Sequence, residues 1–294
     1  MRVVLAGASG LLGTALKASL RADGHEVKTL VRHATDQPGE DSWDPAQGLV
    51  DPQFLADADA VVCLSGIAVA GRRWNDAYKQ QILRSRVDSV GTIARSLAEY
   101  GGPTTFVAAS AVGYYGDTGD REVDEQQPPG ESFLADVCKQ WEAAAEPARL
   151  AGVRVAHPRT GLVLAADGEL LKRIKPLAKA GVYGRLGNGR QYMPWISMAD
   201  EIAALRFLLE HPISGPVNLT APDPVTNAEF TKTLGRVLHR PTVFVVPPFG
   251  ARAVLGEFAG EVLGGQRALP TALLDAGFRF AHTDLAGTLR TELG

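Results

Sequence analysis

The chain has 294 residues, of which 45% are hydrophobic and 21% are charged, and its formal net charge is -3. This length allows one large domain or two modest ones, and the composition excludes a disordered or membrane-embedded chain. The small negative charge gives no electrostatic reason to expect nucleic acid or a membrane surface as a partner. With two cysteines and no apolar run long enough for a signal peptide or a membrane span, we expect a cytoplasmic protein without a disulfide framework.

From residue 1 to about residue 160, short apolar runs alternate with longer amphipathic ones, which predicts strands that alternate with helices. The right-handed crossover rule then gives a Rossmann-type α/β fold, a doubly wound parallel sheet that binds ligands at the carboxyl ends of its strands. The expected strands are 2–7, 26–31, 60–65, 104–110 and 153–158, and the expected helices lie near 11–22, 75–98 and 132–151.

The amino-acid composition of the chain changes after residue 164. Gly- and Pro-rich connections dominate there, and helical patterns persist near 199–210, 227–239 and 283–291. We therefore predict a Rossmann domain at 1–164 and a smaller substrate-binding lobe at 165–294. Later segments are free to return and complete the first domain.

A glycine-rich turn follows the first expected strand, in "VVLAGASGLLGTAL". Glycines between a strand and a helix let the backbone turn tightly and approach a pyrophosphate, whose charge the helix N-terminus stabilises. The pattern predicts dinucleotide binding, and the alternative is a tight turn without a ligand. The residues expected to contact the dinucleotide here are Gly7, Ser9, Gly10, Leu11, Leu12 and Gly13.

The end of the second expected strand, "TLVRHAT", is where an acidic side chain would hold an adenosine ribose hydroxyl. No acid is present, and Arg32 stands there instead. A guanidinium makes charge-assisted hydrogen bonds to a 2′-phosphate, so the residue favours NADP over NAD as the cofactor. The alternative is a solvated surface arginine.

The order of segments resembles the extended branch of the short-chain dehydrogenase/reductase superfamily. The glycine loop matches its phosphate-binding loop, and "CLSGIA" matches a cofactor-lining segment, which implies that Leu64, Ser65 and Gly66 contact the cofactor. Within that branch, "SAVGYYG", "FLADVCKQWE" and "GEFAGEVLGGQRALPTALLDAGFRF" are similar to the little-characterised proteins called the epimerase family. The superfamily often dimerises through two helices, so the resemblance leaves a homodimer open.

Members of this superfamily transfer protons with a tyrosine and a lysine four residues apart, and that pair is missing here. None of the six tyrosines has a lysine four residues later. In "ESFLADVCKQW" (131–141), one register places Leu134 and Cys138 in the two positions and another places Ala135 and Lys139 there. The apolar side chains share one arc of the expected helix and Lys139 points away from it, which favours a packing helix with a solvated lysine.

Other side chains must then carry the chemistry. Ser110 follows the fourth large strand and Tyr114 comes soon after it, so we expect Ser110 to bond a substrate oxygen and Tyr114 to act as acid or base. Tyr115 is typical of a structural turn in the resembled proteins. Arg72, Arg73 and Arg86 lie in segments that could face the cofactor, but each is by default a surface charge, and the sequence does not choose among them.

Substrate contacts are expected from the second lobe. Gln191, Arg185 and the aromatic Trp195 stand where that lobe should meet the cofactor, although each is also an ordinary loop or surface residue type. The histidines show no metal-ligand spacing, so no metal is expected.

These features predict an NADP-dependent oxidoreductase or nucleotide-sugar-epimerase-like enzyme that acts on a small polar molecule. The nucleotide sugar comes from the resemblance alone. The missing tyrosine and lysine leave open a second function, a non-catalytic NADPH-binding regulator or redox sensor.

Overall fold

The computed structural model describes residues 1–294, and the chain divides into two compact units. Each unit is assembled from three segments. The first contains Met1–Ser110, Val137–Arg159 and Ile202–Val217, and the second contains Ala111–Asp136, Thr160–Glu201 and Asn218–Gly294.

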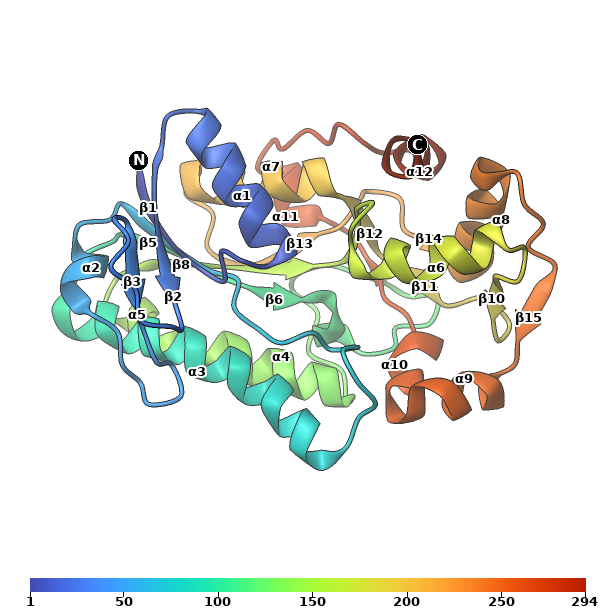
Figure 1. The fold of residues 1–294 in the computed structure, drawn as a ribbon, viewed down its shortest axis with the longest axis horizontal. Helices are drawn as coiled ribbons and strands as arrows, with labels where there is room; N and C mark the ends of the chain where they lie inside the picture. Colours follow the sequence, from blue (N-terminus) through green and yellow to red (C-terminus); the bar gives the residue numbers. More distant parts are fainter. The chain divides into compact units, whose positions relative to one another are not determined.

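The first unit is built on a parallel sheet in the order β13-β8-β5-β4-β1-β2-β3, with the short β6 paired to β8 (Figure 1). This order confirms the predicted doubly wound sheet, because the strand sequence reverses between β1 and β4. The strands are β1 (Arg2–Ala6), β2 (Glu26–Val31), β3 (Glu40–Ser42), β4 (Ala60–Cys63), β5 (Thr105–Ala108), β6 (Ser110–Ala111), β8 (Arg154–Thr160) and β13 (Gly215–Leu219).

Helices cover both faces of this sheet. One face carries α1 and α7, which Arg206 joins by donating to the Ser19 hydroxyl at 3.0 Å and by pairing with Asp23. The other face carries α3 and α5 (Figure 1). The helices of this unit, including two that cross its boundary, are α1 (Leu11–Ala22), α2 (Pro52–Ala56), α3 (Asp76–Tyr100), α4 (Phe133–Ala143), α5 (Glu146–Leu150) and α7 (Met198–Glu210).

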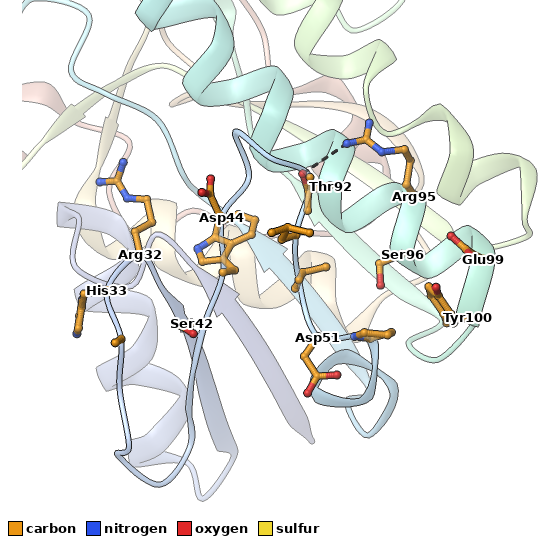
Figure 2. Close-up of a pocket in the computed structure, with 16 residues that line it drawn as sticks. Arg32, His33, Ser42, Asp44, Asp51, Thr92, Arg95, Ser96, Glu99 and Tyr100 are labelled. Carbon is orange, nitrogen blue, oxygen red and sulfur yellow. Dashed lines mark hydrogen bonds between the residues drawn. The ribbon is translucent and has the colours of Figure 1, made fainter.

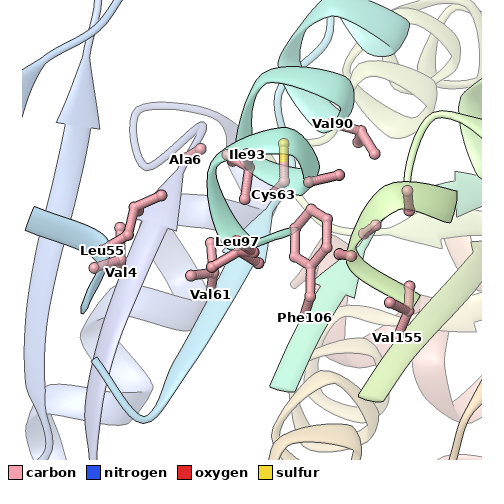
Figure 3. Packing of buried hydrophobic residues seen from close by; sticks show 14 of the residues in the cluster. Val4, Ala6, Leu55, Val61, Cys63, Val90, Ile93, Leu97, Phe106 and Val155 are labelled. Atoms are coloured by element: carbon pink, nitrogen blue, oxygen red, sulfur yellow. The ribbon is translucent and has the colours of Figure 1, made fainter. Parts of the chain in front are cut away.

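The core between the sheet and α3 is apolar throughout (Figure 3). Val61 and Phe106 belong to strands whose side chains are buried on both faces of the sheet. They pack in one cluster with Ile93 and Leu97 of α3. Continuous apolar strands are typical of a parallel sheet covered by helices, so the same residues that predicted the strands also form the core. Cys63 belongs to this core, and Cys63 and Cys138 are both buried free thiols.

The second unit contains short strand pairs and helices around its own core, in which Trp195, Phe230 and Leu289 are fully buried. Its strands are β7 (Glu122–Val123), β9 (Leu162–Leu164), β10 (Gly184–Leu186), β11 (Tyr192–Met193), β12 (Trp195–Ser197), β14 (Val225–Thr226), β15 (Phe244–Val246) and β16 (Arg267–Ala268). Its helices are α6 (Glu169–Lys179), α8 (Asn227–Leu238), α9 (Pro248–Leu255), α10 (Ala259–Leu263), α11 (Thr271–Asp275) and α12 (Leu285–Leu293), with 3-10 turns at Val112–Tyr115 and Gly256–Phe258.

None of the helices combines the length and the apolar run that a membrane crossing requires.

Candidate functional site

The loop between β1 and α1 has a shape that requires glycine. Gly7 has φ +85°, and a Cβ on it would lie 2.8 Å from the Leu64 carbonyl carbon. A Cβ on Gly13 would lie 2.1 Å from the Gly7 carbonyl oxygen, so α1 begins in direct contact with the loop. No side chain caps α1 at Gly10. The amide groups of its first turn are therefore available to an anion.

A cavity of about 640 Å³ lies beyond the carboxyl ends of β2 and β3 (Figure 2). Arg32 and His33, directly after β2, form one side of it, and Thr92 and Arg95 of α3 form the opposite side. Asp44 also lines the cavity, but its carboxylate accepts hydrogen bonds from its own turn, at 3.0 Å from the Ala46 amide and 2.7 Å from the Gln47 side chain. The cavity therefore offers an exposed guanidinium next to the end of β2.

Arg86 of α3 lies beside the segment that follows β4. A Cβ on Gly66 would come within 3.2 Å of the guanidinium carbon of Arg86, so glycine is what allows this approach. The guanidinium also stacks on the Trp141 ring, 5.0 Å from its centroid. Burial lowers the pKa of Arg86, and the Cys138 thiol and the Tyr78 phenol act in the opposite direction. This cation is thus partly buried without a carboxylate partner.

A polar array of three side chains occupies the carboxyl ends of β5 and β8. Ser110 donates its hydroxyl proton to the Glu142 carboxylate at 2.6 Å. The Arg159 guanidinium donates two hydrogen bonds to the same carboxylate, from Nε to Oε1 at 2.8 Å and from Nη2 to Oε2 at 2.9 Å. The Arg159 side chain is 2% exposed and that of Glu142 is 14% exposed. We call these three residues the serine–glutamate–arginine array.

Strand register explains how the array is assembled. β5 and β8 are parallel, and Val107 pairs with Ala156. Three residues further along the chain come Ser110, the first residue of β6, and Arg159 of β8. Because β6 pairs with β8, these two residues lie side by side at the same edge of the sheet. Glu142 reaches them from α4, one helical turn after Cys138.

The helix α4 has the packing character that its sequence predicts. Val137, Cys138 and Trp141 are buried, whereas Lys139 is exposed. No tyrosine stands on this helix. The apolar arc thus ends in an acid, Glu142, that faces the sheet rather than solvent.

The tyrosines that follow Ser110 differ from each other. Tyr115 is buried, and its hydroxyl donates to the Asn218 side chain at 2.7 Å, which fits a structural turn. Tyr114 is half-buried and packs edge-on against the Tyr115 ring, with centroids 5.5 Å apart.

The three residues expected to bind substrate lie in the second unit. Trp195 is buried in its core and donates its indole N–H to the Asp223 carbonyl. Gln191 donates to the Leu186 carbonyl, and the exposed Arg185 donates to the Asn188 carbonyl. These contacts are internal to that unit, and their roles in substrate binding stay predictions.

Glu201 at the start of α7 is fully buried. One carboxyl oxygen accepts from the Thr160 hydroxyl at 2.8 Å, and the other has no hydrogen-bond partner. Burial raises the pKa of Glu201 to about 8. In the unfolded chain the same carboxyl ionises near 4.5, so the folded state retains a proton that the unfolded state loses between these two values.

We expect the stability of the protein to fall as pH rises from about 4.5 towards 8, by an amount on the order of a few kcal/mol from Glu201. Glu201→Gln should remove this part of the slope, as measured by urea unfolding at several pH values. Glu210→Gln, on the exposed end of the same helix, is the matched control and should leave the slope unchanged. Equal slopes in wild type and Glu201→Gln would contradict the expectation.

The sequence model of the NAD dependent epimerase/dehydratase family matches residues 3–220. The chain belongs to that family. A model of a domain of unknown function matches residues 246–292 of this epimerase/dehydratase family member.

Relatives match over almost the whole length. Epimerase family protein MT2273 of Mycobacterium tuberculosis is 49% identical over 289 residues, which cover 98% of this chain and 96% of the relative. A crystal structure of human epimerase family protein SDR39U1 with NADPH has a TM-score of 0.89 at 32% identity and covers 99% of both chains. A nucleoside-diphosphate sugar epimerase from Corynebacterium glutamicum has a TM-score of 0.82 at 36% identity, over 100% of this chain and 58% of that one. The predicted resemblance and fold are confirmed.

Two members of the array were not among the expected site residues. Glu142 carried a detectable signal, because an acid stands in line with Leu134 and Cys138 at helical spacing. Arg159 is a charge inside the apolar strand run "VRVAHPRTGL". A charged side chain on a buried face requires a partner of opposite charge, so Glu142 and Arg159 are each a candidate partner for the other.

Proposed function

We propose that this chain is an NADP-dependent enzyme, an oxidoreductase or a nucleotide-sugar-epimerase-like protein that acts on a small polar molecule without the usual tyrosine and lysine. The observation that carries the proposal is the serine–glutamate–arginine array. It lies at the carboxyl ends of β5 and β8, on the half of a doubly wound sheet that receives the second nucleotide of a dinucleotide.

The chain has the features that a dinucleotide requires. The Gly7 to Gly13 loop packs too closely against neighbouring backbone to admit a Cβ at either glycine, and the uncapped start of α1 offers amide groups to a diphosphate. Arg32 beside the cavity after β2 would hold a 2′-phosphate, which supports NADP rather than NAD. The human relative whose structure contains NADPH supports the same choice.

Arg86 would hold the nicotinamide half of the cofactor. It lies between the segment after β4 and helix α4, whereas Arg32 lies after β2, on the adenosine side of the point where the strand order reverses. A guanidinium carries five N–H donors, and Arg86 uses one of them on the Ile82 carbonyl. A partly buried cation without a carboxylate partner is stabilised when a ligand supplies oxyanion or hydroxyl acceptors.

Arg86→Met is therefore expected to weaken NADPH binding by about 10- to 100-fold, the loss of one charge-assisted contact. The binding of adenosine 2′,5′-bisphosphate, which lacks the nicotinamide half, should be unchanged. Titration calorimetry with both ligands measures the contrast. Arg84→Met, on the exposed face of the same helix, is the control and should alter neither affinity. An equal loss for both ligands would contradict this assignment.

The chain's own residues would orient the substrate and move its proton. A bound nicotinamide supplies the hydride acceptor or donor. Ser110 would bond the reacting oxygen of the substrate, and the buried Arg159 keeps the Glu142 carboxylate next to that hydroxyl. Tyr114 stays a second candidate acid or base. The named activity of the Corynebacterium relative supports a nucleoside-diphosphate sugar as the substrate class.

The test of the proposed function is a single-turnover experiment with protein-bound NADPH and a panel of sugars, ketones and quinones. Loss of the near-ultraviolet absorbance of NADPH supports the enzyme. Saturable NADPH binding without hydride transfer to any compound favours the regulator or redox sensor instead. Failure to bind NADPH at all would refute both.

A further inference from the structure

The hydrogen bond between Ser110 and Glu142 has a defined direction. An ionised carboxylate only accepts, so the proton of this bond comes from the Ser110 hydroxyl. The donor capacity of that hydroxyl is then used, and its lone pairs stay available to accept a proton from another O–H group. A substrate hydroxyl that meets Ser110 would therefore donate to it.

The surroundings hold the Glu142 carboxylate in place beside the Ser110 hydroxyl. Arg159 fixes both oxygens of Glu142 in a bidentate geometry, and its burial prevents the pair from separating into solvent. His157 of β8 also interacts with this carboxylate, but burial lowers the pKa of His157 and so favours the neutral imidazole. The anionic group that the Ser110 hydroxyl contacts is thus Glu142.

We propose that Glu142 is the terminal proton acceptor of the site and that the Ser110 hydroxyl passes the proton to it. This inference rests on the proposed function, which supplies the oxidised nicotinamide. In the oxidation direction, the C–H bond of a substrate alcohol breaks and its hydride goes to the nicotinamide. The substrate O–H proton goes to Ser110 Oγ while the Ser110 proton goes to Glu142, and a C=O bond forms. Reduction reverses each transfer.

The array thus replaces a phenol and an ammonium with a hydroxyl and a carboxylate. Ser110 is the group that touches the substrate, and Glu142 and Arg159 act through it. A proton transfer through Ser110 and Glu142 does not require a tyrosine on α4. The buried face of this helix accordingly carries apolar side chains and one acid.

A thiol in place of the hydroxyl tests this arrangement without a substrate. Ser110→Cys introduces a group that titrates near pH ~8.5 in an ordinary setting and whose thiolate reacts with iodoacetamide. An adjacent carboxylate disfavours the thiolate, so we expect the pH midpoint of alkylation to lie above the value of the same variant in urea. Adding Glu142→Gln should lower the midpoint by about one pH unit, which raises alkylation at a fixed lower pH about tenfold. Mass spectrometry of the peptide that contains position 110 separates this thiol from Cys63 and Cys138.

Equal midpoints with and without Glu142→Gln would overturn the inference. So would a folded Ser110→Cys protein that iodoacetamide does not label, because a substrate could not reach the hydroxyl either. If Glu142→Gln does not fold, Glu142→Asp provides a shorter carboxylate, and a midpoint equal to that in urea for Ser110→Cys alone is then the overturning result. Failure to bind NADPH refutes the proposed function and leaves this titration unchanged, so the two failures are distinguishable.

Discussion

Replacing Ser110 by alanine is expected to slow hydride transfer by about 10²- to 10⁴-fold, the range that a positioned proton-transfer group contributes. The substitution removes the hydroxyl and leaves Glu142 paired with Arg159, so folding should be retained. NADPH affinity should change little, because the proposed partner of Ser110 is the substrate oxygen rather than the nucleotide. The loss should thus appear in the rate at saturating substrate.

The measurement is single-turnover decay of NADPH absorbance with whichever panel compound the wild type reduces. Thr105→Val is the matched control, since Thr105 also has a buried hydroxyl, which accepts from Arg154 at 3.0 Å, but it lies at the amino end of β5. It should lower stability without changing the rate. An unchanged rate in Ser110→Ala would remove Ser110 from the chemistry.

Arg159→Met is expected to lower the free energy of unfolding by about 3–5 kcal/mol, because it strands a largely buried carboxylate without its cation. Methionine fills a similar volume, so the loss reports the missing charge and hydrogen bonds more than a cavity. Urea unfolding followed by circular dichroism measures the change.

Arg149→Met is the control for this prediction. Arg149 also pairs with a glutamate, Glu146, in a two-armed geometry, but both side chains are exposed, at 60% and 47%. Solvent screens such pairs, so the urea midpoint should move little. Similar losses in the two variants would show that burial does not account for the contribution of the Arg159–Glu142 pair to the free energy of unfolding.

The parallel sheet was predictable because its strands are buried on both faces. Runs such as Val61–Cys63 and Phe106–Ala108 are continuously apolar and stand between long helical patterns, and the structure has strands at both places. The short β3 was not predicted, since Glu40–Ser42 contains two acids and a serine and carries no apolar signal. Its place at the edge of the sheet comes from pairing with β2.

The candidate site was only partly predictable, for a reason of distance along the chain. Gly7 and Gly13 lie in one local loop whose spacing predicts a role in phosphate binding. Ser110, Glu142 and Arg159 come from three elements, and the pairing of β5 and β6 with β8 brings them together. From a single sequence one can see that Glu142 is aligned with the apolar arc of its helix. The sequence does not show which cation forms an ion pair with it.

The division of the chain has a consequence for how the protein is made. The parallel sheet receives β8 only after residues 111–136, and β13 only after residues 160–201 as well, have left the ribosome; both of these segments belong to the other unit. A nascent chain that ends near residue 160 thus exposes the edge of β8, an unpaired row of amide and carbonyl groups. Because each unit waits for segments of the other, the two are expected to mature together during synthesis rather than one after the other.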